Sequence, residues 1–356
     1  MFWSWYSCLL ENGRATFSQL DVASCCREKK GEQSLIIIFA VLLSTAVAVV
    51  SSFLVADFLS RKFKSMGITG LDVHKRDAPV TAEMGGLSVL VSVALGALLF
   101  YMLEPDFPAT FIAGILTVLL VGIVGVIDDI FTLRQRYKPF LVALMSAPLA
   151  YSLLGTTGIS LPLVGKVPFG ILFPIAIVPL AIATSANLSN MLAGFNGLES
   201  GSAIIGLSAL VFLSWYKGEH VGLALGALFL GGYLGFLFLN WYPAKIFPGD
   251  TGTLMAGAAI VAVGFVSGLV FAAVVVSIPA GFDFVLKIST RSPFAARSIH
   301  GNTKLSPEGV LMPPNYPALS HAFMRLAAQS ERTLVSSILA MEAIYGILAI
   351  ALTILL

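Results

Sequence analysis

Long apolar runs fill most of this chain, and short polar stretches separate them. A helix needs roughly 20 apolar residues to cross a bilayer core of about 30 Å. Only 11% of the residues are charged and mean hydropathy is +0.92, whereas about a quarter of residues are charged in soluble domains. We expect an all-α, polytopic integral membrane protein with about ten transmembrane helices, at about residues 34–59, 85–103, 109–127, 139–154, 169–186, 201–216, 221–239, 251–267, 269–286 and 333–354.

The eighth and ninth expected helices are the least clearly separated. Between Thr251 and Lys287 only a few residues, among them Gly268 and Pro279, suggest a break. One broken span there is the alternative, and it would reverse the last helix. We expect residues 1–33 to form an amino-terminal tail, either disordered or reflecting a wrongly assigned start, and residues 34–356 to form one transmembrane domain.

Basic residues indicate the orientation. Lys and Arg concentrate on the cytoplasmic side of membrane proteins. Fifteen of them fall in one set of loops, and only Lys166 and Lys217 fall in the opposite loops. The polar stretches are therefore expected to face the cytoplasm, in a plasma membrane or, in a eukaryotic host, in the endoplasmic reticulum. Four basic residues before the first helix would lie outside, in conflict with this rule: Arg14, Arg27, Lys29 and Lys30.

Acidic residues beside the membrane are the first candidates for chemistry. Asp128 and Asp129 follow the third apolar run, and acids so close to a bilayer are costly unless they are solvated, paired or bound to a cation. Neutralisation of the nearby loop cations is an equally good alternative for this pair. Asp250 lies in a Pro-Gly turn before a helix whose free N–H groups favour anions. A bound cation would let the Asp250 carboxylate lie next to a second anion at this helix start. Mg²⁺, with Mn²⁺ as the alternative, binds one or two carboxylates together with substrate phosphates.

Amides and cations supply the rest of the candidate site on the expected cytoplasmic loops. Asn187, Asn190, Asn196 and Glu199 fall within fifteen residues, a density that suits neutral ligation and base-edge hydrogen bonding, although Asn and Gly also form turns. Cationic side chains beside a metal suggest a polyanionic substrate; the candidates are Lys75, Arg297, His300 and Lys304.

At these residues the sequence resembles the polyprenyl-phosphate N-acetylhexosamine-1-phosphate transferases, from about Leu35 to Leu355. Residues 128–138 and 190–199 are most similar to the archaeal and eukaryotic UDP-N-acetylglucosamine dolichyl-phosphate N-acetylglucosaminephosphotransferase branch. The resemblance implies a ten-helix enzyme that transfers a sugar 1-phosphate from a UDP-sugar to a polyprenyl phosphate, with Mg²⁺ and release of UMP, as the first step of lipid-linked glycan assembly. The expected partners are the UDP-sugar, the polyprenyl phosphate, the bilayer and a second copy in a homodimer, with no nucleic acid.

The resemblance also implies roles for individual residues. Asp250 and Asn190 match the metal ligands, and Lys138 matches a lysine that contacts the nucleotide diphosphate. Asp128 and Asp129 match paired acids, one of which deprotonates or positions the acceptor phosphate. Asp128, Asp129, Lys138 and Asp250 are thus the expected catalytic residues, and the expected substrate-binding residues, with Asn196 reading uracil and Glu83 near the nucleoside, are Lys75, Glu83, Asn187, Asn196, Glu199, Arg297, His300 and Lys304. Roles for Asp283 and Glu342 stay open.

Departures from the family pattern limit the choice of substrate. Thr132 stands where the bacterial pattern has a third acid, and His300 stands alone where the muramoyl-pentapeptide branch has a histidine cluster, which argues against a pentapeptide substrate. The same reaction with another UDP-sugar or with undecaprenyl phosphate is the alternative. A membrane transporter or lipid flippase is the alternative from another class, but transporters bind substrates near the bilayer midplane, whereas the polar stretches here lie at one surface.

Overall fold

The computed structural model describes residues 19–162, 164–289, 303–327 and 329–356. Helices dominate, which confirms the expected all-α class. They are α2 (Gln19–Met66), α3 (Gly86–Leu103), α4 (Ala109–Phe131), α5 (Lys138–Met145), α6 (Ala147–Ser152), η1 (Phe173–Ile177), α7 (Val178–Leu192), α8 (Leu198–Lys217), α9 (His220–Asn240), α10 (Gly249–Val266), α11 (Val270–Val276), α12 (Ile278–Ile288), α13 (Leu319–Leu326) and α14 (Glu331–Leu355). Helix α2, the first one in the described part of the chain, includes residues 19–33 of the expected tail.

Three short antiparallel hairpins join some of the helices. They pair β1 (Thr69–Leu71) with β2 (Val80–Ala82), β3 (Gly158–Leu161) with β4 (Gly165–Pro168), and β5 (Lys304–Leu305) with β6 (Leu311–Met312). In the first hairpin Thr69 lies opposite Ala82 and Leu71 opposite Val80. The strands are too short to form a separate β-domain.

The number of full-length spans is smaller than expected. In the described part of the chain, eight helices are long and apolar enough to cross a membrane, and α11 with α12 forms a ninth, bent by 53°. Pro279, in the first turn of α12, accounts for this break because proline has no backbone N–H to donate to the preceding turn. The expected span 139–154 is instead two short helices, α5 and α6, that together are about 22 Å long. The expected helices at 251–267 and 269–286 are separate, so they are not one broken span.

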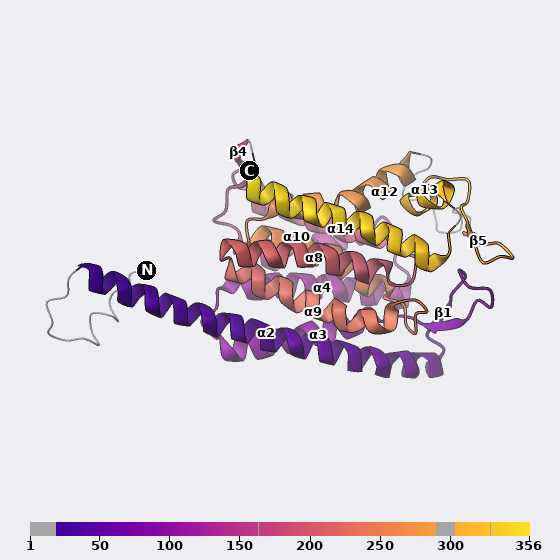
Figure 1. Ribbon diagram of the computed structural model, residues 1–356, viewed down its shortest axis with the longest axis horizontal. Helices are drawn as coiled ribbons and strands as arrows, with labels where there is room; N and C mark the ends of the chain where they lie inside the picture. The colour runs from indigo at the N-terminus through magenta and orange to yellow at the C-terminus, as the bar shows by residue number, and fades with distance from the viewer. Residues whose placement is uncertain (1–18, 163, 290–302, 328) are drawn as a thin grey trace.

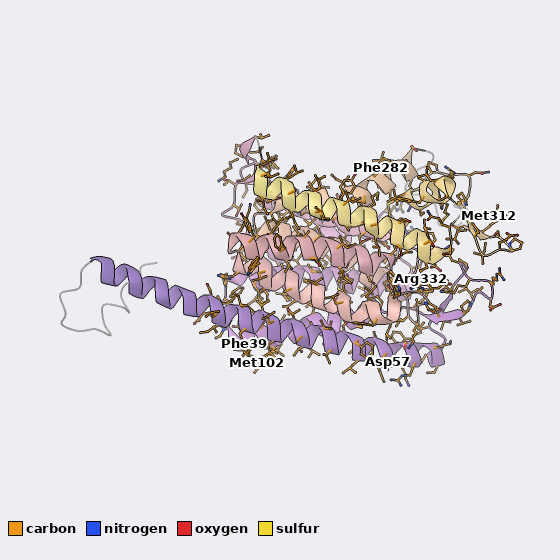
Figure 2. All side chains as sticks on the ribbon, in the orientation of Figure 1. Phe39, Asp57, Met102, Phe282, Met312 and Arg332 are labelled. Atoms are coloured by element: carbon orange, nitrogen blue, oxygen red, sulfur yellow. The ribbon has the colours of Figure 1, made fainter. Side chains whose placement is uncertain are left out.

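The two ends of the bundle differ in character. Figure 1 shows β1, β5 and α13 at one end, and β4 with the carboxyl terminus at the other. Exposed apolar side chains, including Phe39 and Met102, point outward along the bundle, while Asp57 and Arg332 lie toward the end with β1 (Figure 2). An apolar belt with polar groups gathered at one end is the distribution that an integral membrane protein requires.

Helix α10 is the centre of the packing, because glycines let its neighbours approach its backbone. A Cβ at Gly86 on α3 would lie 2.1 Å from the backbone N of Gly252, and one at Gly125 on α4 would lie 2.4 Å from the Cα of Thr251. Small residues permit such close contact in membrane bundles. The first turn of α10 is therefore pressed against α3 and against the end of α4 that carries Asp128.

Candidate active site

A cavity of about 520 Å³ opens at the end of the bundle that carries β1. Four separate polar stretches contribute to its wall: the residues around the β1–β2 hairpin, the end of α4, the end of α7 with the loop that follows, and the start of α10. The structure thus brings together seven residues expected from the sequence, namely Glu83, Asp128, Asp129, Asn190, Asn196, Glu199 and Asp250.

A buried ion cluster lies beside this cavity. The ammonium of Lys138, which is fully buried, forms ion pairs with Asp128 and with Asp250, and its Nζ is 3.0 Å from Asp250 Oδ2. The loop after α4 turns back at Thr132, whose backbone is left-handed, and the N–H of Leu133 then donates to Asp128 Oδ1 over 2.6 Å. This turn places Lys138, the first residue of α5, against two carboxylates that are far apart in sequence. A buried charge is tolerated only when it is paired in this way.

Asp129 makes different contacts from its neighbour, because consecutive side chains of a helix point about 100° apart. Its carboxylate accepts the N–H of Asp250 over 2.6 Å, and the N–H and hydroxyl of Thr251 over 3.1 and 2.7 Å. The sequence predicted an anion at the start of this helix, and in the structure the anion is a carboxylate of the same chain. Asp129 therefore fixes the turn that presents Asp250.

Asn190 lies on α7, opposite the first turns of α10. The hydroxyl of Thr253 donates to Asn190 Oδ1 over 2.9 Å, and the hydroxyl of Ser185 donates to the carbonyl of Gly257 over 2.9 Å, so the two helices are tied together. The amide oxygen and the Asp250 carboxylate are hard donors of the kind Mg²⁺ prefers. Three aspartates line this part of the cavity and one lysine pairs with two of them, and this excess of negative charge also fits a divalent cation.

A second network holds Asn196 at the opposite wall of the cavity. Its side-chain amide donates to Asp72 Oδ2 and its backbone N–H donates to Glu331 Oε1, each over 2.9 Å. Lys75 forms an ion pair with Asp72, lies 3.9 Å from Glu331 Oε2 and stacks over the ring of Tyr242. The expected binding residue Lys75 therefore supports this wall through its carboxylate partners.

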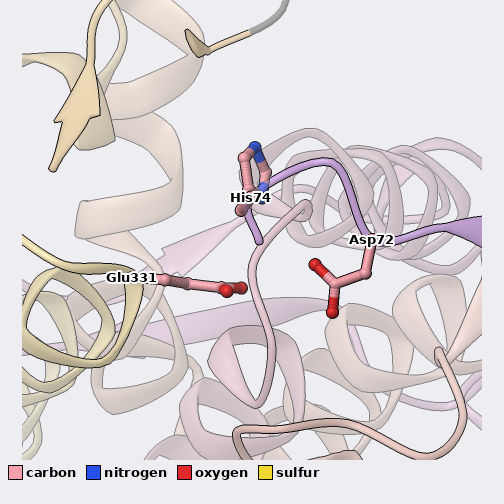
Figure 3. A group of neighbouring side chains, drawn as sticks. All are labelled: Asp72, His74 and Glu331. Carbon is pink, nitrogen blue, oxygen red and sulfur yellow. The ribbon is translucent and has the colours of Figure 1, made fainter. Parts of the chain in front are cut away.

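His74 completes a group with Asp72 and Glu331 (Figure 3). The potential ligand atoms of the three residues lie within 4.8 Å of one another, and burial lowers the pKa of His74 to about 4, so its ring is neutral near pH 7. The ring stacks on Phe195 at 4.5 Å. Because the Lys75 ammonium already pairs with Asp72 and lies 3.9 Å from Glu331 Oε2, we interpret the group as a salt-bridge network.

Two of these residues were not among the sites expected from the sequence. Neither Asp72 nor Glu331 was identified as a candidate site residue from the sequence. Glu331 begins α14 and is 135 residues from Asn196 in sequence. An acid in the first turn of a helix is common because it interacts favourably with the helix dipole, so nothing in the local sequence indicated this contact.

The other expected residues differ in their relation to the cavity, since Glu199 lines it whereas Asn187 and Lys304 do not. The Asn187 amide donates to the carbonyl of Ala183 on its own helix, and Asn187 does not line the cavity. Glu199 accepts the N–H of Gly194 over 2.6 Å and so closes the turn before α8. Lys304 is exposed on β5, away from the cavity wall. Arg297 and His300 lie outside the described residues.

The two acids whose roles were open both join helices. Asp283 on α12 accepts the N–H of Leu319 over 2.8 Å and pairs with Lys287 at 2.7 Å, so it caps the start of α13. Glu342 on α14 accepts from the hydroxyl of Ser202 on α8 over 3.4 Å. Both arrangements are structural.

Comparison with known proteins identifies related sequences. The model of glycosyl transferase family 4 matches residues 111–268. A protein of Saccharolobus solfataricus named as a UDP-N-acetylglucosamine dolichyl-phosphate N-acetylglucosaminephosphotransferase is 33% identical over 323 residues, which are 88% of this chain and 97% of the relative.

Bacterial proteins are similar over shorter stretches. A phospho-N-acetylmuramoyl-pentapeptide-transferase of Bacillus licheniformis is 27% identical over 66% of this chain and 76% of its own length. A Bacillus subtilis protein named as an undecaprenyl-phosphate N-acetylglucosaminyl 1-phosphate transferase is 31% identical over 53% and 51%. These matches confirm the resemblance seen in the sequence: the chain belongs to glycosyl transferase family 4, in the branch of the polyprenyl-phosphate sugar-phosphate transferases.

Proposed function

We propose that this protein transfers N-acetylglucosamine 1-phosphate from UDP-N-acetylglucosamine to dolichyl phosphate or a closely related polyprenyl phosphate, with release of UMP. The observation that carries the proposal is the buried Asp128–Lys138–Asp250 cluster beside a polar cavity at one end of a membrane bundle. The names of the archaeal and bacterial relatives support the sugar and the class of acceptor. The positive-inside rule supports a cytoplasmic location for this end of the bundle.

Asp250 and Asn190 would hold Mg²⁺. When bound there, the ion supplies charge neutralisation and Lewis acidity to the diphosphate of the donor substrate. The other steps of the proposed mechanism depend on side chains of the protein.

Positioning and charge stabilisation are the main demands of phosphoryl transfer. An oxygen of the acceptor phosphate forms a bond to the β-phosphorus of the UDP-sugar, and the bond from that phosphorus to the bridging oxygen breaks, so that UMP departs with this oxygen. Lys138, buried beside the cavity and fixed by two carboxylates, would stabilise the developing negative charge through the field of its positive charge. Asp128 can take a proton from a monoanionic acceptor, but a phosphate monoester is largely ionised already because its second pKa is about 6.

The contacts of the paired acids favour direct transfer. Both oxygens of Asp128 are engaged, by Leu133 and Lys138, and both oxygens of Asp129 are engaged at the start of α10. Formation of an aspartyl phosphate on either residue would break these contacts. Direct attack by the acceptor leaves them intact.

Asn196 is proposed to read the uracil base. Asp72 can only accept hydrogen bonds, so it fixes the side-chain nitrogen of Asn196 on its own side. The amide oxygen of Asn196 is then left as an acceptor for a base-edge N–H. Uracil offers a donor at N3, whereas cytosine offers an acceptor there.

An apolar groove gives the acceptor lipid a place in the bilayer. The groove, of about 700 Å³, lies between α7, α10 and the bent α11–α12 pair, and it reaches Leu188, which is two residues from Asn190. An isoprenoid chain in this groove could remain among apolar side chains while its phosphate enters the polar cavity. This arrangement supports a transferase rather than a transporter, because the polar groups gather at one surface and not at the midplane.

The test is release of labelled UMP by the purified protein, with matched variants Asp250→Asn and Asp106→Asn. Asp106 is exposed in the loop between α3 and α4 and does not line the cavity. We expect UMP only when acceptor lipid and Mg²⁺ are both present, with activity lost in Asp250→Asn and kept in Asp106→Asn. A folded protein that releases no UMP from a panel of UDP-sugars would overturn the proposal.

A further inference from the structure

A second cavity, of about 730 Å³, lies at the same end of the bundle and shares no lining residue with the candidate active site. Its wall is formed by the last turns of α2, by the loop that follows α9 and by four residues of the β1–β2 hairpin, namely Lys75, Pro79, Val80 and Thr81. Four of its eleven lining side chains are cationic and none is acidic; the cations are Arg61, Lys64, Lys75 and Lys245. The cavity is therefore suited to an anion.

Two of these four cations are not paired with a carboxylate within the described residues, so their charge is available to an anionic ligand. Arg61 pairs with Asp57 on the same helix, and Lys75 pairs with Asp72. Within the described ranges, neither Lys64 nor Lys245 has a carboxylate at ion-pair distance. Both are exposed, one on α2 and one on the loop after α9, so an anion between them would bridge the two elements.

The position of the cavity relative to the bilayer indicates the kind of anion. The apolar span that ends at Met66 has 34 residues, about 51 Å of helix, whereas a bilayer core is about 30 Å thick. The helix is thus longer than the core, and its last turns carry Arg61, Lys62 and Lys64, so we place this end in the interfacial region, where lipid phosphates lie. Basic residues at this depth attract anionic lipids.

Apolar surface continues from the cavity toward the membrane. Phe53 precedes the cavity residue Ser60 by two helical turns, about 10 Å. Its ring meets that of Phe238 on α9 edge to face, with centroids 6.1 Å apart, and the two side chains are 40% and 71% exposed. A soluble phosphate would gain nothing from this surface, whereas the acyl chains of a phospholipid would cover it.

We propose that this cavity binds the headgroup of an anionic phospholipid. The phosphate lies between Lys64 and Lys245, and the acyl chains follow Phe53 and Phe238 between α2 and α9. Lys75 lines the cavity and also pairs with Asp72, the residue that holds Asn196. The bound lipid thus supports the hairpin that forms one wall of the candidate active site.

The test uses the full chain and a pair of matched double variants. Lys64→Glu/Lys245→Glu reverses the two cavity charges. Lys62→Glu/Lys166→Glu makes the same change in net charge at exposed residues that do not line the cavity. Native mass spectrometry of delipidated protein is titrated with phosphatidylglycerol, phosphatidylcholine and glycerol 1-phosphate.

We expect one saturable phosphatidylglycerol site per chain, about tenfold weaker or more in the cavity variant and unchanged in the control. Phosphatidylcholine and glycerol 1-phosphate should bind weakly to all three proteins. Equal phosphatidylglycerol binding by the two double variants would overturn the proposal, and so would glycerol 1-phosphate binding as tight as that of the lipid. A rise in KM for polyprenyl phosphate in the cavity variant alone would assign the cavity to the acceptor and would also overturn it.

Discussion

Lys138→Met removes a buried charge and leaves two carboxylates facing each other. The Nζ of Lys138 is 3.0 Å from Asp250 Oδ2, and one such contact is worth about 5–6 kcal/mol at an effective dielectric constant of about 20. Desolvation offsets much of this energy, and breaking a buried ion pair by removing one partner typically costs about 3–5 kcal/mol. We therefore expect the free energy of unfolding to fall by about 3–5 kcal/mol and transferase activity to be lost.

A second substitution separates the effect on stability from the effect on chemistry. Lys138→Met/Asp128→Asn removes one of the two stranded carboxylates, so it should recover part of the lost stability and no activity. Lys166→Met, at an exposed position of β4, is the control. Denaturant titration in detergent, followed by tryptophan fluorescence, gives the free energies of unfolding. The same stability for Lys138→Met as for the parent protein would show that the ion cluster is not buried as described.

Three further predictions follow from particular contacts. Asp129→Ala removes the carboxylate that caps α10, so unfolding in denaturant should show a loss of about 1–2 kcal/mol and kinetics should show a lower kcat; a stable variant with parental kcat would contradict the capping role. Asp72→Asn removes the carboxylate that holds the side-chain amide of Asn196. The KM for the UDP-sugar should therefore rise about tenfold, which corresponds to about 1.4 kcal/mol, with little change in kcat and with weaker discrimination against CDP-sugars. An unchanged KM would refute this role of Asp72. The buried, neutral His74 has its pKa lowered to about 4 from 6.5, so the unfolded chain binds more protons below pH 6.5 and stability should fall as pH drops from about 7 to 4; His74→Gln should flatten this part of the pH–stability curve, and an identical curve would exclude the effect.

The sequence alone indicated several residues of the candidate active-site cavity, but it did not predict the contacts between residues that are distant in sequence. Aspartates beside apolar runs and a Pro-Gly turn before a helix stand out because such groups are costly near a bilayer. Asp128, Asp129 and Asp250 stand out for this reason, and in the structure all three line one cavity. The different contacts of Asp128 and Asp129 were not predictable from the sequence, because they depend on how closely α4 approaches α10 at Gly125.

Contacts between distant elements explain the remaining differences. Glu331 joins Asn196 only because α14 begins beside the loop after α7, and no periodicity reports such an approach. The expected fourth span divides at Ser146 into α5 and α6, which apolar composition alone does not reveal. Lys75 was expected to bind substrate, whereas its ammonium contacts Asp72 and Glu331, a pairing that depends on the fold of the β1–β2 hairpin.

The most direct test of the central claim follows the β-phosphorus of the donor substrate. Purified protein is given UDP-N-acetylglucosamine labelled at the β-phosphate, dolichyl phosphate and Mg²⁺, and the lipid and aqueous products are then separated. A sugar-phosphate transferase moves the labelled phosphorus into the lipid fraction and leaves unlabelled UMP in the water, and this is the result we predict, with Asp250→Asn giving neither product. Label that remains in water as UDP while the sugar alone enters the lipid would show glycosyl transfer and would contradict the account.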